Sequence, residues 1–137
     1  MPDCLFCKIA KGEILAQKIA EDDKTVAFLD IHPRAPGHAV VIPKHHSETL
    51  LDLPDDDVAA LFLAVKAVSR RVLSALRADG ATIGINQGEV SGQTVPHLHV
   101  HILPRFTNDG GGSVHSVVSN PSAEPPEEMV ERIKKQK

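Results

Sequence analysis

The longest regular pattern along the chain is a helical one between residues 55 and 76. Apolar side chains recur there every three or four residues, which is the period of an amphipathic helix. They are Val58, Leu61, Phe62, Val65, Val68, Val72, Leu73 and Leu76. Pro54 stands at the start and three aspartates, residues 55–57, fill the first turn, an arrangement that suits a helix N-terminus. The pattern predicts one long helix over residues 55–76.

Shorter apolar runs bounded by turn residues predict strands on both sides of this helix. The predicted strands cover residues 25–29, 38–42, 81–86 and 97–103, and a further apolar run covers residues 14–20. A short helix is expected over residues 4–11, where Gly12 ends it, and another over residues 127–135. Short strands in series around one long helix indicate an α+β domain with an antiparallel sheet.

Composition narrows the class of protein. The chain has 137 residues, of which 42% are hydrophobic and 24% charged, as expected for one globular domain. No apolar run approaches the roughly 20 residues that span a bilayer, and the N-terminus lacks the pattern of a secretory signal, so we expect a cytoplasmic protein without a membrane partner. A net charge of −3 with four Phe, no Tyr and no Trp argues against a nucleic-acid polymer as ligand.

Histidine is the unusual component, with eight residues in the chain. Three of them alternate with apolar residues in His97-Leu98-His99-Val100-His101. In a strand, alternate side chains share a face, so the three imidazoles would stand in a row about 6.6 Å apart. Such a row suits nucleophilic attack on phosphorus, with neighbouring imidazoles as donors to the phosphate. It equally suits a zinc site with an open position for water, and the spacing alone leaves both hypotheses open.

The run from His97 to Leu103 resembles the motif of the histidine triad (HIT) family, His-φ-His-φ-His-φ-φ, in which φ is apolar. The resemblance extends from about Cys4 to Arg105 through several further motifs. They are Phe28-Leu29-Asp30-Ile31, Gly37-His38, Val41-Ile42-Pro43-Lys44, Asn86-Gln87-Gly88 and Gly92-Gln93-Thr94. The chain is most similar to the Hint branch, whose members release AMP or GMP from nucleoside phosphoramidates and related adenylates. The family's other large branch cleaves dinucleoside polyphosphates.

The resemblance implies a fold of about five antiparallel strands with one long helix and a short N-terminal helix. Residues 1–105 would form the HIT domain, and residues 106–137 a polar C-terminal extension packed on the same domain, with no role assigned. A symmetric homodimer is expected as in the Hint branch. The predicted long helix agrees with this, because Leu63, Ala64 and Ala67 place apolar surface on a flank that one small sheet cannot cover.

The resemblance also implies residue roles. His99 would be the nucleophile that takes up the nucleotidyl group, His101 would hydrogen-bond the α-phosphate, and His38 would support them. Gln93 and Thr94 would be donors near the phosphate and leaving group, and the family usually has Ser in place of Thr94. Asp30 and Asn86 fall at ribose and phosphate contacts, and the loop around Gly92 would cradle the phosphate through its N–H groups. The positions that line the base pocket in the family are Leu5, Phe6, Ile9, Phe28 and Ile31.

The only two cysteines form a Cys4-x-x-Cys7 motif, which in a cytoplasmic chain indicates a metal or redox site. Two thiolates need two further ligands to close a tetrahedral zinc site. The resemblance supplies His46 and His97, so a structural zinc ion is expected on these four residues.

Three functions follow as hypotheses. The first is a hydrolase or transferase that acts on the α-phosphate of a purine nucleotide through a covalent intermediate on His99. The second is a zinc metallohydrolase that uses the triad as metal ligands. The third is a nucleotide-binding protein without catalysis.

Overall fold

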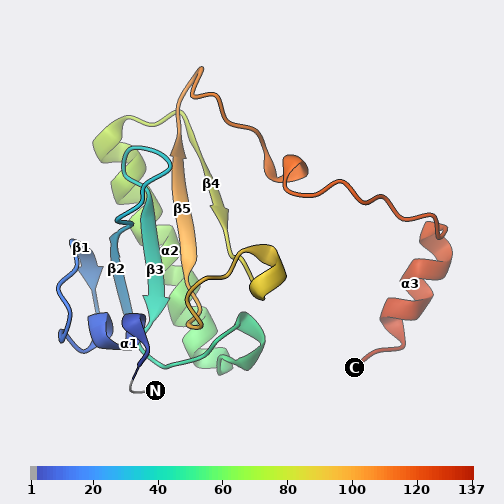
Figure 1. Cartoon of the computed structure of the whole chain (residues 1–137), viewed down its shortest axis with the longest axis horizontal. Coiled ribbons are helices and arrows are strands. Elements are labelled where there is room, and N and C mark those ends of the chain that lie inside the picture. The colour runs from blue at the N-terminus through green and yellow to red at the C-terminus, as the bar shows by residue number, and fades with distance from the viewer. Residues whose placement is uncertain (1–2) are drawn as a thin grey trace.

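The computed structural model of the protein describes residues 3–137. Its centre is a five-stranded sheet in the order β1-β2-β3-β5-β4, antiparallel at every pairing (Figure 1). The strands are β1 (Lys18–Glu21), β2 (Thr25–Leu29), β3 (Ala39–Pro43), β4 (Gly80–Gly84) and β5 (Val100–Arg105). The helices are α1 (Leu5–Ala10), α2 (Asp55–Leu76) and α3 (Pro126–Lys134). The predicted α+β class and antiparallel sheet are confirmed.

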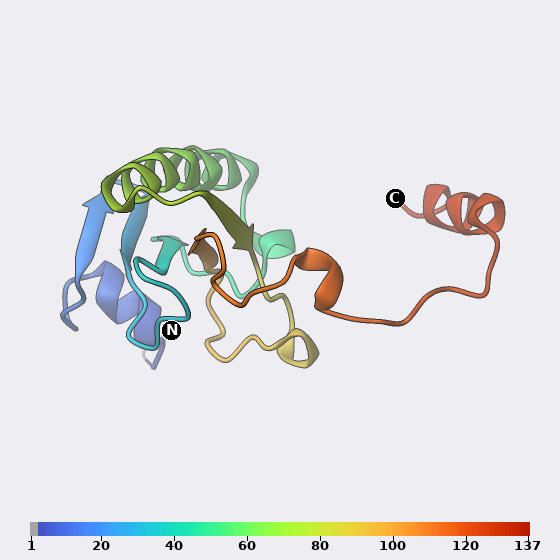
Figure 2. The ribbon, with the colours of Figure 1, turned by 90° about the horizontal axis from the view of Figure 1, so that it is seen from above.

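Helices lie on both faces of the sheet (Figure 2), and the two faces bury different sets of side chains. Helix α2 lies across one face, where Leu61, Val65 and Val68 pack against alternate residues of β3 and β5. The short α1 covers part of the opposite face, where Phe6 and Ile9 pack with side chains of β2 and β3. Because strand residues alternate between faces, a residue of β5 belongs either to the α2 core or to the α1 side.

The long helix has the predicted bounds, and the strands differ from prediction at their ends. Strand β5 begins at Val100 instead of His97. In the register that pairs Val41 with Val100, the residue opposite Leu98 is Pro43, which has no N–H to continue the ladder. The Leu98 N–H donates to the carbonyl of Ser47 instead, at 2.7 Å. The first part of the triad therefore lies in an extended segment that bends away from β3.

The chain after β5 leaves the sheet. Arg105 holds the first residues after β5 in place, because its guanidinium forms a bidentate ion pair with Asp109 and also donates to the carbonyl of Gly112. Beyond this point the backbone extends away, and α3, which has no buried residue, stands apart from the sheet (Figures 1 and 2). The expected packing of residues 106–137 on the same domain is therefore not seen for α3 within one chain. Among residues 3–137, no helix is both long enough and apolar enough to cross a membrane.

Candidate active site

The three triad histidines lie on the α1 side of the sheet, as the alternation predicts. The residues between and after them, Leu98, Val100 and Ile102, are buried in the core beneath α2. The imidazoles nevertheless divide between two places. His97 is fully buried among the cysteines, whereas His99 and His101 line a cavity of about 420 Å³.

This cavity brings together most of the residues expected to bind nucleotide. Its walls come from α1, the end of β2 with the loop after it, and the segment between β4 and β5. The expected residues that line it are Leu5, Phe6, Ile9, Phe28, Asp30, Ile31, Asn86, Gly92, Thr94, His99 and His101. The wall formed by Ile14, Leu15 and Ala16 was not assigned to the site from the sequence. The sequence signal for this wall is the apolar run over residues 14–20, which follows Gly12.

One ring nitrogen of His99, Nδ1, is hydrogen-bonded to the backbone, and Nε2 is the nitrogen that remains for a substrate. Its Nδ1 lies 2.7 Å from the carbonyl oxygen of His97, and because a carbonyl only accepts, Nδ1 carries the proton. Nε2 then holds a lone pair. The ring stands between Phe6 and His101, with ring centroids 5.0 Å from each, and only 7% of the residue is exposed. The imidazole is thus held in the orientation and tautomer that a nitrogen nucleophile requires.

His101, which lines the cavity, is hydrogen-bonded to His38, which does not line it. The peptide N–H of Arg34 donates to His38 Nδ1 at 3.1 Å, so the proton of His38 is on Nε2. That Nε2 lies 2.9 Å from His101 Nδ1, which therefore accepts and leaves a proton on Nε2 of His101. Burial lowers the pKa of His101 to about 4 and also lowers the pKa of His38. Both rings are therefore neutral near pH 7.

Gln93 does not line the cavity, although it was expected to contact substrate. Its Oε1 accepts from the Gly88 N–H at 2.9 Å, and its Nε2 donates to the carbonyls of Glu48 and Val95. The amide is fully used within the protein. In this structure Gln93 holds the glycine-rich loop in place, while Thr94 beside it faces the cavity.

Cationic side chains are missing from the cavity. Among the described residues that line it there is no Lys or Arg, and Asp30 is the one carboxylate. Asp30 Oδ1 accepts from the His32 N–H at 2.8 Å, and its Oδ2 lies 3.5 Å from His38 Nε2. A bound phosphate would have to be held here by neutral donors.

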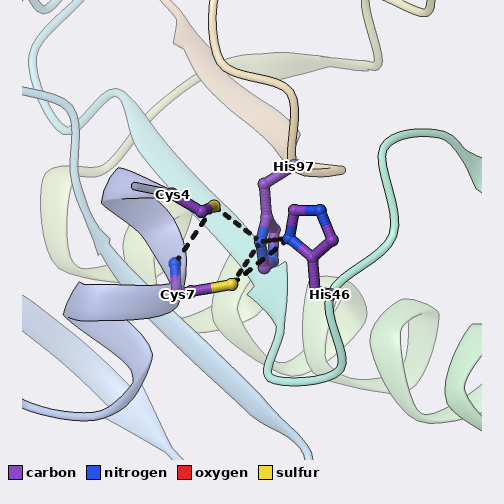
Figure 3. Close-up of side chains that lie close together, drawn as sticks. All are labelled: Cys4, Cys7, His46 and His97. Carbon is purple, nitrogen blue, oxygen red and sulfur yellow. Dashed lines mark hydrogen bonds between the residues drawn. The ribbon is translucent and has the colours of Figure 1, made fainter. Parts of the chain in front are cut away.

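The cysteines and two histidines converge at the N-terminus of α1 (Figure 3). Cys4 Sγ lies 3.4 Å from His97 Nδ1, Cys7 Sγ lies 3.2 Å from His46 Nδ1, and the two Nδ1 atoms are 3.2 Å apart. A tetrahedral zinc ion with Zn–S of about 2.3 Å and Zn–N of about 2.0 Å separates its ligand atoms by about 3.3–3.8 Å. The four side chains therefore fit a closed zinc site.

The protonation of His97 also fits a metal. Its Nε2 lies 2.8 Å from the carbonyl of Pro43, so Nε2 carries the proton and the lone pair of Nδ1 faces the thiols, as in many metal-bound histidines. Burial lowers the pKa of His97 to about 4 and raises the pKa of the Cys7 thiol. His97 faces the two cysteines, and the Nδ1 of His99 is hydrogen-bonded to the backbone. The three triad imidazoles therefore do not converge on one ion.

The buried histidines predict how stability depends on pH. Because the pKa of His101 falls from 6.5 to about 4 on folding, the unfolded chain binds more protons between these values. The free energy of unfolding should therefore fall as the pH drops from about 6.5 to about 4. Urea unfolding at several pH values tests this in the wild type and in His101→Gln, which removes one of these groups. The variant should show a shallower fall, and equal slopes would contradict the assignment.

Known proteins identify the family. A model of the HIT domain matches residues 11–108. An uncharacterized HIT-like protein of Methanocaldococcus jannaschii is 47% identical over 78% of this chain and 82% of that relative. The adenosine 5′-monophosphoramidase of Saccharomyces cerevisiae is 38% identical over 79% of this chain and 66% of the yeast protein. The crystal structure of a HIT family member from Bacillus subtilis matches with a TM-score of 0.86 and 36% identity, covering 98% of this chain and 96% of that one. The chain therefore belongs to the histidine triad family.

Proposed function

We propose that this protein hydrolyses purine nucleoside phosphoramidates through a covalent nucleotidyl intermediate on His99. The observation that carries the proposal is the hydrogen bond from His99 Nδ1 to the His97 carbonyl at 2.7 Å, which in the neutral imidazole leaves the lone pair on Nε2, in a cavity of nucleotide size. Relatives named as hydrolases, such as the yeast adenosine 5′-monophosphoramidase, support the reaction class.

In the first step the lone pair of His99 Nε2 forms a bond to the α-phosphorus. The bond from phosphorus to the leaving nitrogen breaks with its electron pair, and the released amine takes up a proton at the open side of the cavity. The positive charge that develops on His99 is stabilised by the His97 carbonyl, which accepts from Nδ1. His101 Nε2–H donates to a non-bridging oxygen, where charge builds up in the transition state.

In the second step water attacks the same phosphorus. The bond to His99 Nε2 breaks, its electron pair returns to the ring, and the proton of the water is released as the nucleoside monophosphate leaves. Splitting the displacement in this way lets the same histidine serve as nucleophile and leaving group.

Phe6 and Phe28, whose ring centroids are 5.5 Å apart, together with Ile31 give the apolar wall that a purine base requires. The carboxylate of Asp30 suits the ribose hydroxyls, to which it can only be an acceptor.

The charge of the cavity favours an amine as leaving group. A polyphosphate would bring several negative charges into a site whose described lining has one carboxylate and no Lys or Arg. A phosphoramidate carries one negative charge, and its leaving group departs as a neutral or cationic amine. We therefore favour phosphoramidates over dinucleoside polyphosphates. The geometry opposes a metallohydrolase in which the triad binds one ion, since the triad imidazoles point to separate partners.

Replacing His99 with Asn should abolish turnover while nucleotide binding survives. Asparagine keeps a polar side chain but removes the attacking nitrogen. We therefore expect the kcat for tryptamine adenosine 5′-phosphoramidate to fall by several orders of magnitude. His101→Asn is the comparison, because loss of one donor costs about 10²–10³ in rate. Steady-state kinetics test the loss of turnover in the two variants, and calorimetry of AMP binding tests whether nucleotide binding survives. A near wild-type rate for His99→Asn would refute the mechanism.

We further propose that Cys4, Cys7, His46 and His97 hold one zinc ion. The donor set and the distances of 3.2–3.5 Å among these atoms support it. Zinc in this site would be structural, because four protein ligands leave no open position. It would crosslink α1 to the segment that leads into β5, and so would hold Phe6 beside His99.

Zinc content tests this directly. Protein purified without added metal should contain one zinc per chain, and the Cys4→Ser, Cys7→Ser double variant should contain none and melt at a lower temperature. His45→Ala is the matched control, because His45 is exposed and faces Asp57 instead of the cysteines. Full zinc content in the double variant would refute the site.

A homodimer is the remaining proposal. On the outer face of α2, Phe62 and Leu63 are 41% and 68% exposed, and Ile83 on the edge strand β4 is 44% exposed. Exposed apolar surface on α2, together with an open strand edge at β4, favours a second copy as the partner.

Sedimentation equilibrium should give about 29 kDa at micromolar concentration, twice the chain mass of 14.7 kDa. Leu63→Lys should shift the mass toward the monomer, since it places a charge in the apolar face. Leu51→Lys is the control, because Leu51 is even more exposed, at 82%, but lies in the 3₁₀ turn Leu50–Asp52 and not on α2. A wild-type mass near 14.7 kDa would contradict the proposal.

A further inference from the structure

We propose that the peptide N–H of Arg34, positioned by the turn at Pro36-Gly37, sets the tautomer of His101 through His38 and so keeps an N–H directed at the bound phosphate. Arg34 is thus a positioning residue that acts through its backbone. The part of the inference that concerns phosphate rests on the proposed function, whereas the tautomer assignment does not.

The pair of neutral imidazoles could hold its protons in two ways. In the observed geometry His38 Nε2–H donates to His101 Nδ1, and Nε2 of His101 keeps a proton. If both rings exchanged tautomers, His101 Nδ1–H would donate to His38 Nε2 across the same 2.9 Å. The lone pair of His101 Nε2 would then face the cavity, where it would repel a phosphate oxygen instead of binding it.

The Arg34 N–H distinguishes the two arrangements. It lies 3.1 Å from His38 Nδ1, and a peptide N–H can only donate. The exchanged arrangement would place a proton on His38 Nδ1, so that two donors would face each other in a buried position. Asp30 acts in the same direction, since its Oδ2 is nearer to His38 Nε2, at 3.5 Å, than to His101 Nδ1, at 4.0 Å. His99, the other group beside His101, already has its Nδ1 proton bonded to the His97 carbonyl.

The scaffold fixes where this N–H lies. Residues 35–38 form a turn closed by the His38 N–H to the Ala35 carbonyl at 3.1 Å. Pro36 and Gly37 occupy its central positions, and the φ of +77° at Gly37 is that of a type II turn, which favours glycine. A Cβ on Gly37 would lie 2.2 Å from Leu76 Cδ1. The turn is therefore packed against the end of α2, and its position depends on the main core.

The side chain of Arg34 is not required by this arrangement. It is exposed, and it makes no hydrogen bond or ion pair with the residues that the structure describes. Because the peptide N–H and the side chain of Arg34 have different roles, two matched variants can test them separately. Arg34→Ala removes the side chain and keeps the N–H, whereas Arg34→Pro removes the N–H itself.

The experiment measures the tautomers of His38 and His101 by long-range ¹H–¹⁵N correlation spectra near pH 7, without ligand. We expect both rings to be protonated at Nε2 in the wild type and in Arg34→Ala. In Arg34→Pro a substantial population of His101 should carry its proton on Nδ1. Its kcat on adenosine 5′-phosphoramidate of tryptamine should fall about 10- to 100-fold, which is less than the loss of a whole donor, while the amide spectrum of α2 and the sheet is retained.

A second route guards against misfolding of the proline variant. Gly37→Ala should displace the turn and give the same mixed tautomers, and adding Leu76→Ala removes the clashing methyl and should restore part of the wild-type signal. A wild-type His101 protonated at Nδ1, or an unchanged tautomer in both Arg34→Pro and Gly37→Ala, would overturn the proposal. A wild type that shows the expected tautomers but no phosphoramidase activity would refute the proposed function and not the tautomer assignment.

Discussion

The burial of Leu98, Val100 and Ile102 beneath α2 is the constraint on which the site depends. Because side chains alternate along an extended chain, fixing these three in the core fixes His97, His99 and His101 on the opposite face. The imidazoles could not turn toward solvent without pulling apolar side chains out of the core. The energetic cost of exposing such side chains, about 1.5–3 kcal/mol each, makes the row of histidines a property of the fold rather than of a mobile loop.

Each imidazole then acquires its own role from the backbone group it meets. The carbonyl of Pro43 directs the lone pair of His97 toward the thiols, the carbonyl of His97 directs the lone pair of His99 into the cavity, and the N–H of Arg34 acts on His101 through His38. Peptide groups cannot change their donor or acceptor character, so His99 is held as the Nδ1–H tautomer, while His97 and His101 are held as the Nε2–H tautomer. In the proposed function, this is how one repeated residue type supplies a metal ligand, a nucleophile and a donor within five residues.

The sequence predicted the parts of the structure that are encoded locally. The helix over residues 55–76 was predicted with its observed bounds because many apolar positions share one period. The start of β5 was placed too early, since the missing N–H of Pro43 acts on a residue 55 positions away. The use of the Gln93 amide within the protein could not be predicted, because its partners at Glu48 and Val95 are backbone carbonyls. A backbone donor such as Arg34 has no signature in the sequence, and the position of α3 is not fixed by burial, since none of its residues is buried.

The covalent bond between His99 and the nucleotide is the central claim, and its detection is the most direct test. Wild-type protein mixed with an adenosine phosphoramidate, quenched in alkali within milliseconds and digested under alkaline conditions, should give one peptide heavier by an adenylyl group. Fragmentation should place that group on His99, and the adduct should disappear as AMP accumulates. Full conversion to AMP with no adduct at any time, or an adduct on a residue other than His99, would contradict the account.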